Sequence, residues 1–273
     1  NHDYRRKDFS GTHNHDDNPC PPEGCSETLG CRNESNEGAP MKSSLRKHLM
    51  LAGSLCLLFT LGPMASANRM HRISNEELHN KIAGGWAGKM IGVSYGAPTE
   101  FNSLAKIWEG ELPEWTPDRV FNSLRQDDLY VNMTLMQTLE KKGRKSSTED
   151  FGTFFRDSRY ALWHANLAAR RALRRGLPAG SSGMPEYNVH ANDIDFQIEA
   201  DFIGLLTPGL YLASNGIADR VGRVMNYGDG LYGGLFVAGM YSAAFVESDV
   251  RRVVENGLAC IPSNSPYAQT IID

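Results

Sequence analysis

The chain has 273 residues and a formal net charge of −4, from 28 lysines and arginines against 32 aspartates and glutamates. With 41% hydrophobic and 22% charged residues, the composition suits a globular core and excludes a wholly disordered chain. The slightly acidic balance also argues against a dedicated nucleic-acid-binding protein, which needs a basic surplus to displace counterions.

Residues 1–40 differ from the rest of the chain. They carry 4 basic and 8 acidic residues and contain no Ile, Val, Met or Trp. Such a segment cannot bury enough apolar surface to offset its ordering entropy, so we predict that it is disordered. Because this segment precedes an export signal, we favour the interpretation that it is upstream sequence translated in frame. A zinc-binding tail is the alternative, although its cysteines lack the paired C-x2-C spacing of such sites.

Residues 41–67 have the pattern of a signal peptide. Met41 is followed by a basic region, by the apolar stretch 49–61 and by the small-x-small sequence ASA at 65–67. The apolar stretch is shorter than the roughly 20 residues that a membrane span needs, although an uncleaved anchor remains an alternative. We therefore predict an exported mature chain, residues 68–273, that is periplasmic or secreted and has no stable membrane association.

The mature chain is predicted to be helical. Ser74 and Glu77 form a capping-box pattern that begins a helix ending near residue 93, and residues 99–125 are predicted to be mostly loop. A second helix is expected from Asp127 to about residue 142, ended by Gly143, and a third from about residue 148. A fourth, over 160–175, ends in four arginines, which indicate a solvated helix end or a phosphate-binding patch.

The remaining sequence continues the helical pattern. Residues 176–191 are predicted to be a loop, and residues 192–206 alternate like a strand but also present a helical apolar face, which we favour. Further helices are expected over 215–225, 231–246, 248–257 and from residue 267 onward. Cys260 is the only cysteine of the mature chain, so no internal disulfide can form.

Two glycine motifs match chemical signatures without their structural context. Residues 92–96 (GVSYG) match the nucleophile elbow, which needs a strand before it and a helix after it. Residues 228–233 (GDGLYG) match the dinucleotide fingerprint, which needs a strand within a βαβ unit. Since the surrounding sequence is helical, both motifs indicate ordinary helix ends.

Gln126, Asp127 and Asp128 form a third motif at a junction between loop and helix. Adjacent carboxylates repel each other, and an oxygen-binding cation such as Mg²⁺ or Ca²⁺ relieves that repulsion. The alternative is an ordinary acidic helix start.

Several motifs, in order, resemble the ADP-ribosylglycohydrolase family between about residues 75 and 260. Residues 82–88 (IAGGWAG) and 95–101 (YGAPTEF) look like the family's glycine-rich first helix and its G-A-P-x-E-F turn. Residues 126–129 occupy the place of its T-D-D-T metal motif. Residues 192–209 are similar to its central helix, and residues 226–229 resemble its H-x-D-type loop.

The resemblance implies an all-α fold, a compact orthogonal helical bundle, with two Mg²⁺ ions. It implies hydrolysis of a ribosyl N- or O-glycosidic bond, in a small-molecule or protein-linked ADP-ribosyl conjugate or a related riboside. Asp127 and Asp128 would be the catalytic residues and, with Gln126, the metal ligands. The residues implied or considered as substrate-binding are Glu100, Asn226, Gly228, Asp229, Asp193 and Asp195; for Asp193, Asp195 and Glu199 a solvated acidic stripe is the alternative.

Two departures from the family pattern affect the expected activity. Gln126 and Leu129 replace the two threonines of T-D-D-T, and the family's C-terminal D-x-D-T metal motif is absent. We therefore expect a divergent domain that is incomplete at its C-terminus. The competing hypothesis is a non-catalytic exported helical binding protein, or an inactive fragment of such an enzyme.

Overall fold

The structure, a computed structural model, describes residues 70–273. The predicted disordered segment 1–40, its zinc-binding alternative and the predicted signal peptide 41–67 lie outside the described residues. Within residues 70–273 the regular elements are helices, and no strand is found there, which confirms the predicted all-α fold. None of the helices in this range combines the length and apolar character needed to cross a membrane.

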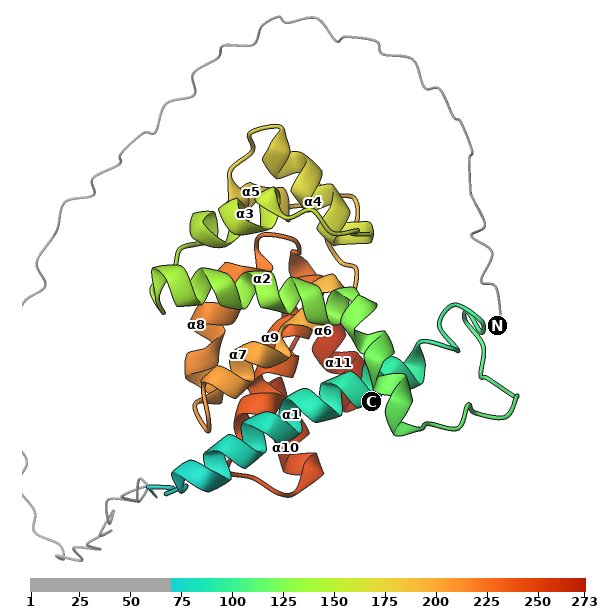
Figure 1. Cartoon of the computed structure of the whole chain (residues 1–273). Coiled ribbons are helices and arrows are strands. Elements are labelled where there is room, and N and C mark those ends of the chain that lie inside the picture. The colour runs from blue at the N-terminus through green and yellow to red at the C-terminus, as the bar shows by residue number, and fades with distance from the viewer. Residues whose placement is uncertain (1–69) are drawn as a thin grey trace, which may run out of the picture. The chain divides into compact units, whose positions relative to one another are not determined.

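Figure 1 shows the helices of the described residues. In order, they are α1 (Asn75–Gly96), the 3₁₀ helix η1 (Pro117–Arg125), α2 (Asp127–Lys142), α3 (Thr148–Asp157), α4 (His164–Arg174), α5 (Ala179–Ser182), α6 (Asp195–Glu199), α7 (Asp201–Leu206), α8 (Tyr211–Gly222), α9 (Gly228–Ala243), α10 (Val250–Leu258) and α11 (Pro266–Ile272).

Local capping explains several helix boundaries. The Ser74 hydroxyl accepts a hydrogen bond from the Glu77 amide at 3.0 Å, which begins α1 as predicted. The predicted bounds of α2 are confirmed, with Gly143 at φ 82° ending the helix. Ser147 and Asp150 form a reciprocal capping box at the start of α3.

Other predicted boundaries are wrong. Helix α4 begins at His164 rather than at residue 160, and the expected loop 176–191 contains the short helix α5. The stretch 192–206 is helical, as favoured over a strand, but it is divided at Ala200 into α6 and α7. Helix α8 begins earlier than expected, at Tyr211, and α9 begins at Gly228.

Helix α9 lies at the centre of the bundle and packs against α6, α7, α8 and α10. Its glycines permit this close packing. A Cβ atom at Gly234 would lie 2.0 Å from Cδ1 of Phe196, and one at Gly204 of α7 would lie 2.4 Å from the Ala238 carbonyl oxygen of α9. The fully buried phenylalanines of the core come from α3, α6 and α7; they are Phe151, Phe155, Phe196 and Phe202.

The two glycine motifs do not have the structures that their signatures require. Ser94 lies inside α1, where its hydroxyl donates to the Ile91 carbonyl and accepts from the Trp115 indole, both at 3.0 Å. Residues 228–233 begin α9, and no strand precedes either motif within residues 70–273. Both motifs are therefore parts of helices, as the surrounding sequence indicated.

Candidate functional site

A cavity of about 270 Å³ lies between the end of α1 and the start of α2. Its lining includes three of the predicted site residues, Glu100, Gln126 and Asp128, together with Gly92, Val93, Gly96, Ala97 and Thr99. Glycines at the end of α1 keep the wall of the cavity free of bulky side chains. The motif at residues 95–101 and the motif at residues 126–128 therefore meet in space although η1 and a long loop separate them.

Local structure fixes the two walls of this cavity. After α1, the turn containing Glu100 is held by hydrogen bonds from Thr99 Oγ1 to the Gly96 carbonyl at 3.0 Å and from Asn102 Nδ2 to the Pro98 carbonyl at 2.8 Å. Gln126 is the extended residue between η1 and α2, so Asp127 and Asp128 fall in the first turn of α2. Carboxylates in that position are stabilised by the helix dipole.

Asp127 and Asp128 are half-buried, and the surroundings of Asp128 disfavour its negative charge. Burial raises the pKa of Asp128 to about 6; the nearby carboxylates of Asp127 and Asp201 add to this rise, and Lys89 opposes it. A cation at this position would relieve the repulsion. Because the available donors are carboxylate and amide oxygens, the set fits a hard cation such as Mg²⁺.

A buried ion pair connects the helices next to this cavity. Lys89 Nζ of α1 lies 2.8 Å from Asp201 Oδ2 of α7, and both side chains are about 5% exposed. Lys89 also donates to the Ile198 carbonyl at 2.7 Å, and Asp201 accepts from Asn132 Nδ2 of α2 at 2.8 Å. Sequence reasoning missed this pair, for which a lysine in the glycine-rich second half of α1 was the available signal.

The acidic residues of α6 are buried rather than forming a solvated stripe. Asp195 accepts hydrogen bonds from the Asn166 amide at 2.9 Å and the Ala165 amide at 3.4 Å, so it caps the start of α4. Glu199 is fully buried; its Oε1 accepts from Asn166 Nδ2 at 2.6 Å, whereas its Oε2 has no partner. Burial, and then the charge of Asp195, raise the pKa of Glu199 well above its usual value.

Asp193 and Asp195 lie beside two histidines that sequence reasoning did not identify. One ligand atom each of His164, Asp193 and Asp195 lie within 4.8 Å of one another. His190 Nδ1 is 2.8 Å from Asp193 Oδ2, and the rings of His164 and His190 are 5.5 Å apart. The described chain therefore contains a carboxylate and histidine cluster, with the composition of a metal site, in addition to the cavity at α2.

Asn226 holds the loop that carries Asp193. Its side chain is fully buried, accepts from the Phe196 amide at 3.0 Å and donates to the carbonyls of Ala191 at 2.9 Å and Asp193 at 2.8 Å. These bonds use its amide hydrogens and its oxygen, so the structure favours a positioning role over the predicted contact with substrate.

Gly228 and Asp229 begin α9 next to the same loop. Gly228 has φ 55°, and a Cβ atom there would lie 2.8 Å from Asn192 Oδ1, so the glycine allows the loop to approach; its predicted place at the substrate stays a prediction. Asp229 is half-buried in the first turn of α9, where a carboxylate suits the helix dipole. Its predicted contact with substrate stays a prediction.

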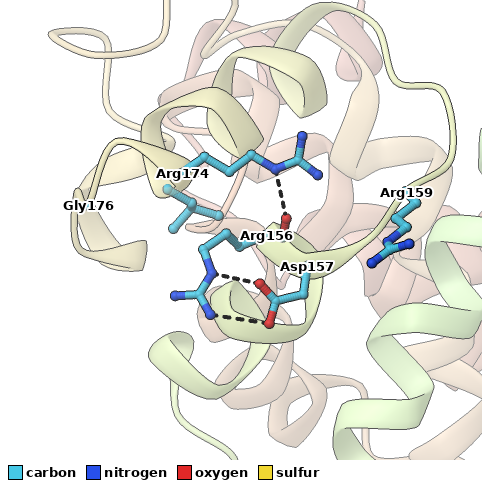
Figure 2. A pocket seen from close by; sticks show the side chains of 6 residues that line it. Arg156, Asp157, Arg159, Arg174 and Gly176 are labelled. Carbon is cyan, nitrogen blue, oxygen red and sulfur yellow. Dashed lines mark hydrogen bonds and ion pairs between the residues drawn. The ribbon is translucent and has the colours of Figure 1, made fainter.

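A cavity of about 590 Å³ contains none of the predicted site residues (Figure 2). It lies between the ends of α3 and α4 and is lined by Arg156, Asp157, Arg159 and Arg174, with Leu173 and Gly176. Arg156 pairs with Asp157 at 2.8 Å, and Arg174 Nε donates to the Arg156 carbonyl at 3.1 Å. Arg174 thus bonds to the α3–α4 connection while it stays exposed, as Arg171 and Arg175 do, whereas Arg170 is buried.

Comparison with known proteins gives one match. No curated protein and no solved structure matches the chain. The family model described as ADP-ribosylglycohydrolase matches residues 74–273, which extends from the cap of α1 to the last residue. A glycohydrolase-type function follows from this match. With its all-α fold and with the first-turn and acidic motifs meeting at one cavity, the chain belongs to the ADP-ribosylglycohydrolase family.

Proposed function

We propose that this chain hydrolyses the N- or O-glycosidic bond of a ribosyl group with the help of Mg²⁺. The substrate would be a small-molecule or protein-linked ADP-ribosyl conjugate, or a related riboside. The observation that carries the proposal is the cavity at the start of α2, which unites Glu100, Gln126 and Asp128. The family match supports the reaction type, and the oxygen-rich donor set supports the metal.

The residues that would hold Mg²⁺ are Gln126, Asp127 and Asp128, and the family resemblance implies two ions. When bound, Mg²⁺ would supply charge neutralisation for the leaving group and a lowered pKa for a bound water. Asp128 fits this role because burial disfavours its charge in the absence of a cation. Below about pH 6 its carboxylate takes up a proton, so we expect cation binding and activity to fall there.

The remaining residues position the substrate and the metal ligands. Glu100 is exposed on the turn at one wall of the cavity, where its carboxylate can accept hydrogen bonds from sugar hydroxyls. Lys89 and Asp201 connect α1, α2 and α7, so they fix the positions of the helices that form the cavity walls. Pre-organised groups of this kind lower the barrier because no reorganisation is needed during the reaction.

The proposal is tested by measuring release of ADP-ribose from an ADP-ribosylated peptide. The full chain is assayed with Mg²⁺ and with EDTA, and compared with Asp127→Asn and Asp128→Asn. Each variant should lose roughly 100-fold or more in activity, because it removes a metal ligand. Glu140→Gln, which removes an exposed charge from the far end of α2, is the matched control and should retain activity.

Two other outcomes would reject the proposal in different ways. Release that persists in EDTA and in both aspartate variants would show that the chemistry does not depend on this metal site. Binding of ADP-ribose without release from any conjugate would support the alternative, a non-catalytic binding protein.

A further inference from the structure

The cluster of His164, Asp193 and Asp195 has a different composition from the cavity at α2. One ligand atom from each residue lies within 4.8 Å of the other two, and the residues come from the start of α4, the loop before α6 and the start of α6. An imidazole nitrogen with two carboxylates is a common ligand set for Zn²⁺, whereas Mg²⁺ prefers oxygen donors alone. The ligand types therefore select for a different cation.

Neighbouring groups already orient the two carboxylates. The Asn166 amide bonds Asp195 Oδ1 at 2.9 Å, and His190 Nδ1 bonds Asp193 Oδ2 at 2.8 Å. Outer partners of this kind fix metal ligands and contribute to metal affinity. Because His164 is exposed and Asp193 is half-buried, a cation can reach the cluster from solvent.

In the part of the chain that the structure describes, no lysine or arginine forms an ion pair with the acidic residues at this cluster. Within residues 70–273 Asp193 pairs only with His190, and neither Asp195 nor Glu199 forms an ion pair with lysine or arginine. Asn166, which bonds both Asp195 and Glu199, has a buried Oδ1 without a partner, as does Glu199 at Oε2. Buried acceptors without partners therefore lie on side chains that are connected to Asp195 through Asn166.

We propose that His164, Asp193 and Asp195 form a second metal site. It binds a divalent cation that accepts imidazole nitrogen as a ligand, such as Zn²⁺, and His190 orients Asp193. Three protein ligands leave a fourth position open for water or for a ligand, as in other zinc sites with an open position. Its ligands are different residues from the proposed Mg²⁺ ligands Gln126, Asp127 and Asp128, and the inference does not rest on the proposed hydrolase activity.

Titration calorimetry with ZnCl₂ on the chelator-treated full chain tests this site. The variant His164→Asn removes the imidazole while keeping a residue that tolerates the left-handed backbone, since His164 has φ 38°. It should bind one equivalent of Zn²⁺ fewer than the parent. His190→Gln should keep that equivalent but weaken it by roughly 10- to 100-fold, because it removes an orienting partner rather than a ligand.

Matched controls separate this site from the others. Residues 1–40 contain histidines and cysteines of their own, so the stoichiometry is compared between variants. His79→Asn, at an exposed histidine of α1, and Asp128→Asn, at the proposed Mg²⁺ site, should both retain the equivalent that His164→Asn loses. Circular dichroism without metal confirms that the variants are folded. Unchanged zinc stoichiometry and affinity in folded His164→Asn, or loss of the equivalent in Asp128→Asn, would overturn the proposal.

Discussion

Replacing Lys89 with methionine tests how the helices around the candidate Mg²⁺ site are held together. The substitution keeps the length and apolar stem of the side chain but removes the charge that faces Asp201 at 2.8 Å. Because both partners are about 5% exposed, water cannot solvate the carboxylate that remains. Breaking a buried pair from one side costs about 3–5 kcal/mol.

For Lys89→Met, the remaining contacts of Asp201 favour the lower end of this range of about 3–5 kcal/mol. After the substitution Asp201 still accepts from Asn132 Nδ2 at 2.8 Å and from the Phe202 amide at 2.9 Å, so its charge keeps two donors. The Ile198 carbonyl loses the donor that Lys89 supplied at 2.7 Å. We therefore expect Lys89→Met to lower the free energy of unfolding by about 3 kcal/mol, a large fraction of a typical domain's stability.

Urea unfolding followed by circular dichroism measures this effect. The double variant Lys89→Met/Asp201→Asn removes both charges and should recover about 2 kcal/mol of the loss. Lys142→Met is the control, since Lys142 lies 3.8 Å from Asp150 on the surface and should contribute less than about 1 kcal/mol. A loss below about 1 kcal/mol in Lys89→Met, or no recovery in the double variant, would refute the reasoning.

Three further predictions concern charge, packing and the loop before α6. The pKa of Asp128 is raised to about 6, so the native state binds a proton more tightly than the unfolded chain, and the contribution of Asp128 to stability falls as pH rises from about 4 to 6. In EDTA, the melting temperature of Asp128→Asn should therefore exceed that of the parent above about pH 6 and equal it below about pH 4. Gly204→Ala should destabilise by about 1–3 kcal/mol in urea unfolding, since its Cβ would meet α9 backbone, whereas Gly88→Ala, with nothing within 4 Å, should stabilise α1 by up to about 1 kcal/mol. Asn226→Ala should cost about 3 kcal/mol in the same assay, because it removes three hydrogen bonds to backbone groups, although the Ala191 carbonyl keeps the Tyr227 amide as a donor; a loss below about 1 kcal/mol would contradict its positioning role.

The comparison of α2 with α4 shows which helix boundaries local sequence determines. Helix α2 begins at two aspartates and ends at a glycine, both within its own sequence, and its predicted bounds are confirmed. Helix α4 has no capping side chain at Trp163, and its first amides are bonded instead by Asp195. A cap that comes from a distant part of the chain has no local signature, so the predicted start was wrong.

The residues of the candidate sites also fall into those that the sequence could predict and those that it could not. Glu100, Gln126 and Asp128 could be predicted to act together because they match motifs of the family that the sequence resembles, and the structure places them around one cavity. His164 and His190 could not be found in this way, since only the packing of α4 against the loop before α6 brings them to the aspartates. The alternating acidic pattern of residues 193–201 indicated a strand or a helix, but not that Glu199 is buried.

The cap that Asp195 provides for α4 has a consequence for the way in which the domain opens. Because the first turn of α4 is completed by a residue of another segment, the two should unfold locally as one cooperative unit. The amides of Ala165 and Asn166 should therefore exchange their hydrogens at the same rate as the amides of the loop before α6. A cation that holds Asp195 would slow both sets together, so hydrogen exchange at the start of α4 would report occupancy of a site whose other carboxylate ligand lies in the loop.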